Sequence, residues 1–284
     1  MEIIRARTAG FCMGVSLALQ KLDAALRKSG EEPGIRICTL GPIIHNPQVL
    51  AAYEARGVVC ATEETPLGSS DMVLIRAHGV TREAEARLRA AGARVVDATC
   101  PKVKKAQLAI ARATADGATL LLFGEADHPE VRGLVSYAGG EAHVFGSPAE
   151  LTNLGLDASL PHVLASQTTQ DRKTFETLRD ELCQRLPKLE VLSTICDATR
   201  QRQEEARRIA SQVDVMVVVG GRQSGNTRRL ADVAALGGIP TWHVESVDEL
   251  DAENFQQKCR AGLTAGASTP KSLIDATENW LASL

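Results

Sequence analysis

Short, nearly continuous apolar runs alternate with longer amphipathic stretches along the whole chain, and this alternation constrains the fold more than any other feature. Runs too short for helices are typical of parallel strands buried on both faces, with helices as the crossovers between them. The sequence therefore predicts an α/β fold with mainly parallel sheets. Strands are expected over 35–40, 72–76, 94–97, 119–123, 162–166, 190–193, 215–220, 241–244 and 261–264, and helices over 15–26, 81–91, 103–116 and 199–211.

The charge balance and the aromatic content exclude two classes of partner. Asp and Glu outnumber Lys and Arg by 35 to 32, and no basic tract stands out, whereas surfaces that bind nucleic acids are strongly basic. Aromatic residues make up 3% of the chain, too few for a platform that stacks bases. No apolar run approaches the ~20 residues that span a bilayer, and no signal-peptide core opens the sequence. We expect a cytoplasmic protein with no nucleic-acid partner and no membrane partner.

The seven cysteines are the second informative feature. An odd number, spread through a chain without a secretory signal, is a poor disulfide framework and a better metal or redox set. Cys12, Cys100 and Cys196 each precede a predicted helix, at intervals of about 90 residues, the length of one small α/β unit. These intervals predict three domains. Their boundaries are 1–98, 99–193 and 194–284.

The remaining cysteines are interpreted as small buried or incidental residues. Cys38 and Cys60 lie in apolar strand-like runs, Cys183 on the apolar side of a predicted helix, and Cys259 in a charged stretch. The chain has no Cys-x-x-Cys pair, so a zinc ribbon or finger is not favoured. Three separated thiolates instead suit an iron–sulfur cluster at a junction of three domains, with one iron left open to substrate because cubane clusters normally take four cysteines.

Polar side chains follow six of the predicted strands, where each strand ends. Ligands of open parallel sheets bind beyond these carboxyl ends, because the loops converge there. Several such loops, together with the cysteine-bearing loops, predict a shared central cavity. The polar residues are His45, His78, His128, Glu130, Thr168, Ser224, Asn226 and Ser268.

Each of these signals has a plainer alternative when it is taken singly. His128 and Glu130 flank Pro129 and could simply begin a helix, with Pro at its first position and Glu favoured by the helix dipole. Gly220 to Asn226 could be a glycine-rich turn, or a phosphate cradle ahead of a helix N-terminus. This loop has neither the lysine of a Walker loop nor the spacing of a dinucleotide fingerprint.

Eight motifs occur in one order from Cys12 to Ser268, and this series resembles the 4-hydroxy-3-methylbut-2-enyl diphosphate reductase family (LytB type). The motifs are Gly-Phe-Cys-Met-Gly, Ile-His-Asn, Ala-His-Gly-Val, Asp-Ala-Thr-Cys-Pro, His-Pro-Glu-Val, Gln-Thr-Thr, Ile-Cys-Asp-Ala-Thr and Thr-Ala-Gly-Ala-Ser. The resemblance implies three similar small α/β domains arranged around a central [4Fe–4S] cluster. It also implies the last step of the non-mevalonate isoprenoid route, in which two electrons and two protons remove the substrate hydroxyl to give isopentenyl and dimethylallyl diphosphate.

The same resemblance implies a role for each matching residue. Cys12, Cys100 and Cys196 would be the cluster ligands, with one iron open. Glu130 would be the proton donor, Thr168 would join the proton relay, and His128 would lie near the substrate hydroxyl. The electron donor would be a one-electron protein such as ferredoxin or flavodoxin. The residues expected to bind the substrate are His45, His78, His128, Thr168, Ser224, Gly225, Asn226 and Ser268.

The chain departs from the family's sequence pattern at one position, and two other functions are alternatives to the reductase. The family's diphosphate loop often reads Ser-Ser-Asn, whereas this chain has Gly225 at the middle position and can offer only a backbone N–H there. Arg228 could add charge to the site, although a solvent-facing position is favoured. Quinolinate synthase also resembles three α/β units around a three-cysteine cluster, but its substrates are dicarboxylate-derived. An iron–sulfur redox sensor would need neither Glu130 nor Thr168.

Overall fold

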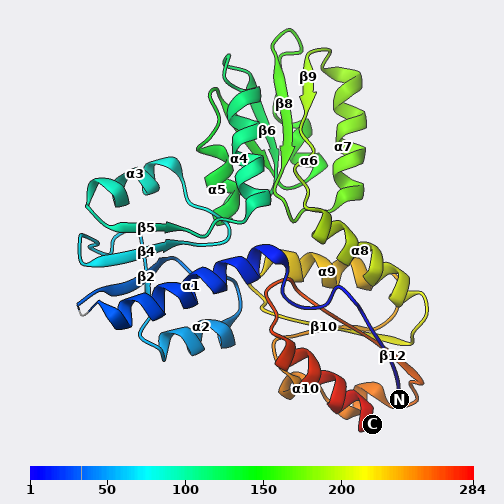
Figure 1. The fold of residues 1–284 in the computed structure, drawn as a ribbon. Coiled ribbons are helices and arrows are strands. Elements are labelled where there is room, and N and C mark those ends of the chain that lie inside the picture. The colour runs from blue at the N-terminus through cyan, green and yellow to red at the C-terminus, as the bar shows by residue number, and fades with distance from the viewer. Residues whose placement is uncertain (33) are drawn as a thin grey trace. The chain divides into compact units, whose positions relative to one another are not determined.

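The computed structural model describes residues 1–32 and 34–284, and within this part of the chain it contains three four-stranded sheets (Figure 1). Every pair of neighbouring strands is parallel. The expected α/β class with parallel sheets is therefore confirmed. The chain forms two compact units, the first made of 1–16, 44–53 and 197–284, and the second of 17–43 and 54–196.

The second unit contains two of the sheets. In the sheet with the order β3-β2-β4-β5, the central strands carry an apolar core that the helix α3 covers with Ala84 and Leu88. The loops beyond the carboxyl ends of β2 and β4 lead to His45 and His78. The elements along this part of the sequence are α1 (Met13–Glu31), β2 (Arg36–Leu40), α2 (Pro47–Glu54), β3 (Val59–Ala61), β4 (Asp71–Ile75), α3 (Arg82–Ala90) and β5 (Arg94–Asp97), of which the start of α1 and nearly all of α2 belong to the first unit.

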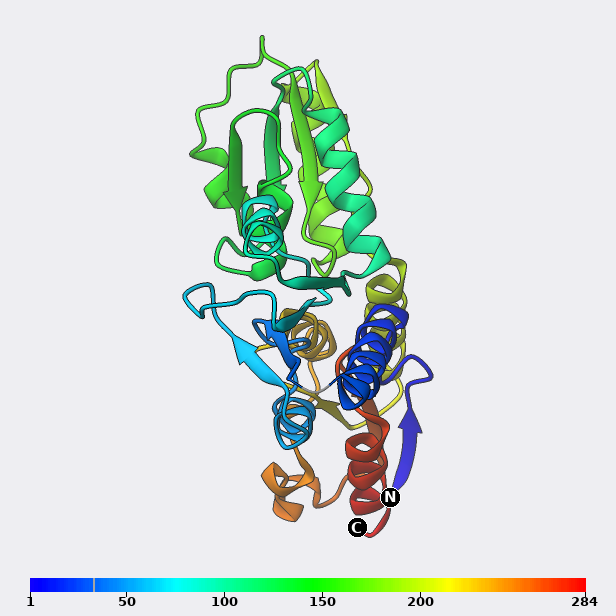
Figure 2. The ribbon, with the colours of Figure 1, turned by 60° about the vertical axis from the view of Figure 1, so that its left-hand side comes forward.

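The other sheet of the second unit has the order β7-β6-β8-β9. One face packs against α4 and α5 through Ile110 and Leu134, and the opposite face packs against α6 and α7 through Leu151 and Leu178. Figure 2 shows α4 lying along its face of this sheet. The elements are α4 (Pro101–Ala113), β6 (Thr119–Phe123), α5 (Pro129–Val135), β7 (Ala142–Phe145), α6 (Pro148–Thr152), β8 (His162–Ser166), α7 (Arg172–Arg185) and β9 (Leu189–Val191).

The sheet of the first unit has the order β1-β12-β10-β11 and joins the two ends of the sequence. Glu2 lies opposite Arg260 and Arg5 opposite Leu263, so the N-terminal strand pairs with the last strand of the chain. The elements are β1 (Glu2–Arg5), α8 (Asp197–Ala210), β10 (Val215–Val219), α9 (Gly225–Ala235), β11 (Thr241–Val244), η1 (Val247–Glu249), η2 (Ala252–Phe255), β12 (Arg260–Ala265) and α10 (Lys271–Ala282).

The three sheets repeat one plan. In each sheet a central strand (β2, β6 or β10) is followed directly by a glycine. The N–H of this glycine donates to the carbonyl of the last residue of the neighbouring strand (β3, β7 or β11), at 2.8, 2.9 and 2.8 Å in the three sheets. The strand on its other side (β4, β8 or β12) pairs with an edge strand, β5, β9 or β1, which leads to Cys100, Cys196 or Cys12. The third repeat thus takes its edge strand from the N-terminus of the chain.

The pairing of β1 with β12 affects the expected division of the chain into three domains. The boundaries 1–98, 99–193 and 194–284 stay a prediction, but β1 lies in the sheet of the third of these segments and not in the sheet of the first. The physical reason is hydrogen bonding, since an edge strand needs a neighbour and the open edge of β12 provides one. The first unit does not correspond to any single continuous segment of the sequence.

All nine expected strands are present, and β1, β3 and β7 are additional. These three are short edge strands with largely exposed or half-buried side chains, so they lack the apolar run that marks a central strand. The interpretation of Cys183 is wrong in one respect, because its side chain on α7 is exposed and not on the buried face. Within the described residues, no helix is long and apolar enough to cross a membrane.

Candidate active site

The candidate residues of the first unit gather around the loop that follows β12. The N–H of Cys12 donates to the carbonyl of Ala267 at 3.2 Å, and the hydroxyl of Ser268 donates to the carbonyl of His45 at 3.0 Å. A Cβ on Gly221 would lie 2.7 Å from that same carbonyl, so only glycine permits this approach of the loop after β10. Three loops far apart in sequence therefore converge here. Together with the α9 residues described next, Cys12, His45 and Ser268 form what we call the first-unit site.

The N-terminus of α9 completes the first-unit site. Ser224 is the N-cap residue, and its hydroxyl oxygen accepts from the N–H of Thr227 at 3.3 Å. That hydroxyl keeps its own proton for donation, and Gly225 and Asn226 form the first turn behind it. The side-chain nitrogen Nδ2 of Asn226 is buried and has no hydrogen-bond partner among the described residues. A helix N-terminus with free donors favours an anion, so the phosphate-cradle interpretation of this loop fits the geometry.

Other buried polar atoms of the first unit also have no partner in the described part of the chain. They were not expected from the sequence, apart from the position of Asn46 beside His45. Most buried polar groups in proteins are hydrogen-bonded, so such an exception marks a place where ligand or water can complete the bonding. The atoms include Asn46 Nδ2, Thr227 Oγ1, Thr264 Oγ1 and Trp242 Nε1.

Two residues of α8 that sequence reasoning missed hold the segment that leads to Cys12. Arg202 is 5% exposed and donates from Nη2 to the carbonyl of Gly10. The carboxylate of Glu205 accepts from the N–H groups of Arg7 and Thr8 at 3.0 and 2.9 Å. Burial acts to raise the pKa of Glu205, but the bonds from Thr8 and Arg7 outweigh it and the pKa lies below its ordinary value. Only the periodicity of α8 could have suggested that these charged residues face inward.

In the second unit, Glu130 and Thr168 form a buried pair. Their side chains lie 1% and 4% exposed. Oε1 of Glu130 accepts from the N–H of Thr168 at 2.6 Å, and Oε2 accepts from its hydroxyl at 3.1 Å. The pair joins the first turn of α5 to the loop after β8, which are 38 residues apart in sequence. A carboxyl group and a hydroxyl group in direct contact can pass a proton between them.

His128 lies beside this pair and contacts His78. It is the N-cap residue of α5, and its Nδ1 accepts from the N–H of Glu130 at 3.1 Å. Since Nδ1 is the acceptor, the neutral ring carries its proton on Nε2. The rings of His128 and His78 meet edge to face, with centroids 5.4 Å apart and planes at 85°. His-Pro-Glu does begin a helix, as its plainer interpretation held, and this helix start also buries Glu130 against Thr168.

Cys100 and Cys196 are tied to the loops of the same unit by their backbone. The N–H of Cys100 donates to Ala77, next to His78, and the N–H of Cys196 donates to Thr168, both at 2.9 Å. Both cysteines are half-buried, lie outside any disulfide, and stand directly before a helix, at the starts of α4 and α8. Cys100, Cys196, His78, His128, Glu130 and Thr168 together form what we call the second-unit site.

Each of the three candidate cysteines therefore has the same local surroundings. In every case its N–H donates to a carbonyl two residues beyond the end of the neighbouring strand, at Ala267, Ala77 and Thr168. In every case the next residue begins a helix. The expectation that all three precede helices is confirmed.

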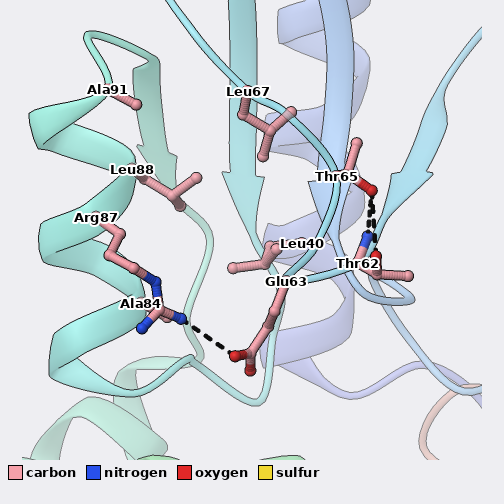
Figure 3. A pocket seen from close by; sticks show the side chains of 9 residues that line it. All are labelled: Leu40, Thr62, Glu63, Thr65, Leu67, Ala84, Arg87, Leu88 and Ala91. Carbon is pink, nitrogen blue, oxygen red and sulfur yellow. Dashed lines mark hydrogen bonds and ion pairs between the residues drawn. The ribbon is translucent and has the colours of Figure 1, made fainter.

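Two further features lie outside the expected set. Arg228 is half-buried and donates from Nη1 to the carbonyl of Arg222 at 3.0 Å, so it is not simply a solvent-facing side chain. A cavity of about 130 Å³ opens between α3 and the loop after β3, where Arg87 pairs with Glu63 at 3.1 Å (Figure 3). None of the expected site residues lines this cavity.

Comparison with known proteins shows which family has this sequence. Residues 3–282 match the family described as LytB protein. The chain belongs to the LytB protein family. A 4-hydroxy-3-methylbut-2-enyl diphosphate reductase from Desulfovibrio desulfuricans is 70% identical to this LytB-family chain, with both proteins covered completely. The reductase of that name from Geobacter sulfurreducens is 46% identical over 97% of this chain and 95% of its own length.

Solved structures of LytB relatives agree in fold. A structure of (E)-4-hydroxy-3-methyl-but-2-enyl diphosphate reductase, described as the terminal enzyme of the non-mevalonate pathway, is 37% identical. It matches with a TM-score of 0.70 over 100% of this chain and 99% of that one. A reductase from Plasmodium falciparum, at 24% identity, matches with a TM-score of 0.92 over 99% of this chain and 88% of that chain, and supports the fold alone.

Proposed function

We propose that this LytB-family chain reduces 4-hydroxy-3-methylbut-2-enyl diphosphate to isopentenyl and dimethylallyl diphosphate, the final step of the non-mevalonate isoprenoid route. The reaction breaks one C–O bond, forms one C–H bond, consumes two electrons and two protons, and releases water. The observation that carries the proposal is the match along the full chain to reductases of this name, one of them 70% identical. The buried pair of Glu130 and Thr168 supports it, because the reaction needs a proton source in a dry site.

We propose that Cys12, Cys100 and Cys196 hold one [4Fe–4S] cluster. The residues present fit such a group, because all three are half-buried thiols outside any disulfide, each directly before a helix, and thiolates are the usual ligands of these clusters. When bound, the cluster supplies electrons and one iron without a cysteine ligand, which can act as a Lewis acid toward the substrate oxygen. A reducing compartment suits seven free cysteines, and we place the reaction in the cytoplasm.

We assign the diphosphate to the first-unit site. Ser224 and Asn226 supply a hydroxyl and an amide as neutral donors, and the N-terminus of α9 adds its dipole. The hydroxyl of Ser268, which donates to the carbonyl of His45, would turn to the anion when substrate binds. His45 contributes its imidazole, and Gly225 contributes a backbone N–H. The family resemblance also assigns His78, a residue of the second-unit site, to the diphosphate. Hydrogen bonds to a charged oxygen contribute about 1.5–3 kcal/mol each, so a few neutral donors suffice without a lysine.

We assign the chemistry of the substrate hydroxyl to the second-unit site. Glu130 delivers the proton that lets the hydroxyl leave as water, and Thr168 relays a proton to the carboxyl group through the 3.1 Å contact. His128, held by the N–H of Glu130, carries its ring proton on Nε2 and orients the hydroxyl. Buried groups held by short bonds lose little entropy when substrate arrives.

This assignment separates the proposal from its two rivals. A dicarboxylate-specific enzyme has no use for a helix N-terminus lined with neutral hydroxyl and amide donors. A redox sensor has no use for a buried carboxyl group held by a threonine. The anaerobic assay of the iron-loaded protein with the hydroxylated diphosphate and reduced methyl viologen tests all three. Formation of both C5 diphosphates with stoichiometric viologen oxidation is expected, whereas viologen oxidation without substrate consumption would overturn the proposal.

A further inference from the structure

A groove of about 690 Å³ runs beside α4 in the second unit. Its floor is one stripe of that helix, with Leu108 as the exposed apolar centre at 46% exposure. Around this leucine lie charged residues from α4, from α1 and from the end of β5. They are Lys104, Lys105, Arg112, Lys21 and Asp97. An apolar centre within a charged rim is the usual anatomy of a protein–protein contact.

The groove is positive, although the whole chain is negative. Four of its charged residues are cations and one is an anion, whereas the formal net charge of the chain is −3. Asp97 is already engaged, since it lies 3.5 Å from Nζ of Lys104 and its carbonyl accepts from Lys21. Lys105 and Arg112 are exposed and form no ion pair within the described residues. These two cations are available to a negatively charged partner.

The groove also begins at a candidate iron ligand. Thr99 and Pro101, which flank Cys100, both line it. Asp97 fixes this end, because its carboxylate accepts from the N–H of Thr99 at 2.9 Å. Lys104 is held in place by Asp97 and by Tyr137, whose hydroxyl accepts from it at 3.4 Å. The start of the groove is therefore ordered around Cys100, one of the three proposed cluster ligands.

We propose that this groove docks the one-electron donor, a small protein whose redox group lies beneath an acidic surface. The inference rests on the proposed function, because that reaction needs two electrons delivered singly. Two donor molecules in succession are each oxidised by one electron at the groove, and the substrate is reduced by two. Lys105 and Arg112 attract the acidic face, and Leu108 packs against the apolar centre of the partner. Electrostatic complementarity of this kind raises the rate of encounter.

The test reverses charge at the two unpaired cations and compares two electron sources. A Lys105→Glu, Arg112→Glu variant is assayed with reduced flavodoxin and, separately, with reduced methyl viologen, a small reductant that needs no docking surface. The KM for flavodoxin should rise at least ~10-fold at low ionic strength, while the viologen-driven rate stays near that of the unchanged protein. The control variant, Lys173→Glu, Arg185→Glu, reverses two exposed cations of α7 and should behave as the unchanged protein in both assays.

Binding gives a readout that does not depend on turnover. The Kd for oxidised flavodoxin, measured by fluorescence anisotropy, should rise by a similar factor in the α4 variant, and Leu108→Asn should raise it several-fold. An unchanged KM and Kd in the α4 variant, with normal viologen-driven activity, would overturn the docking proposal alone. A wild-type protein that binds flavodoxin but does not reduce the substrate with viologen would overturn the proposed function instead.

Discussion

The first-unit and second-unit sites differ in how far their polar groups are satisfied. In the first unit, the side-chain nitrogen of Asn226 is buried without a partner in the described part of the chain, as are polar atoms of Asn46, Thr227 and Thr264. In the second unit, both oxygens of Glu130 already accept hydrogen bonds from Thr168. An unsatisfied donor gains most from an incoming anion, whereas a satisfied carboxyl group is held ready for proton transfer. The difference supports the proposal that the first-unit site binds the diphosphate and the second-unit site carries the chemistry.

The largest effect is expected at the three candidate cysteines, one of which belongs to the first-unit site and two to the second-unit site. Replacing Cys100 by Ala should remove the cluster and abolish activity, because a cubane cluster with two protein thiolates is not retained. Iron content and the visible absorption of the anaerobic protein measure this. The same result is expected for Cys12 and Cys196. Cys183→Ala, at an exposed position, is the matched control, and full iron content in Cys100→Ala would refute the ligand assignment.

The next largest effect tests the chemistry assigned to the second-unit site. Glu130→Gln keeps the shape, and its amide oxygen can still accept from the N–H of Thr168, but it has no proton to release. The protein should keep its iron and bind substrate, yet kcat should fall at least ~100-fold, the usual worth of general acid catalysis. Glu181→Gln, at an exposed position of α7, serves as control. A near-normal kcat would move the proton source elsewhere, with the substrate diphosphate as the first suspect.

The binding assigned to the first-unit site predicts a smaller effect of a different kind. Ser224→Ala or Asn226→Ala removes one donor to a charged oxygen, worth about 1.5–3 kcal/mol. Substrate binding should weaken roughly ten- to a hundredfold, while kcat at saturation changes far less. A loss confined to kcat would erase the distinction between the two sites. Gly225→Ser probes the departure from the family pattern, and a large loss there would show that the chain needs glycine for backbone geometry.

The smallest effect concerns how the Cys12 segment is held. Because the folded pKa of Glu205 lies below its ordinary value of 4.5, the carboxylate stabilises the fold above that pH. This stabilisation is lost as pH falls through the lower folded pKa. Glu205→Gln should therefore lower the free energy of unfolding at pH 7 by about 1–2 kcal/mol and should flatten its dependence on pH below 5. Urea titrations at several pH values measure this, with exposed Glu253→Gln as control. An unchanged unfolding free energy would show that Arg202 alone holds the segment.

Much of this fold and of both sites follows from local sequence. The central strands carry continuous apolar runs, and each of the three candidate cysteines stands directly before a helix. Both features are visible in a window of a dozen residues. The edge strands β1, β3 and β7 cannot be recognised in this way, because their side chains are half-exposed and because they form only by pairing with a strand of the folded sheet. Arg202 and Glu205 were missed for a related reason. These two side chains hold the Cys12 segment through hydrogen bonds with residues 192 and 198 positions away in the sequence, and no local pattern indicates such contacts.

The pairing of β1 with β12 has a consequence for how the protein is made. Residues 2–5 leave the ribosome first, yet their hydrogen-bonding partners at residues 260–263 emerge almost last. Domains that fold from the N-terminus outward during synthesis can begin with the sheets of the second unit, but the edge of the first unit stays open until translation is nearly finished. The segment that carries Cys12 is anchored only then. If Cys12 holds iron as proposed, its delivery therefore belongs after synthesis, and a chain that stalls before residue 260 leaves an exposed strand edge for chaperones to cover.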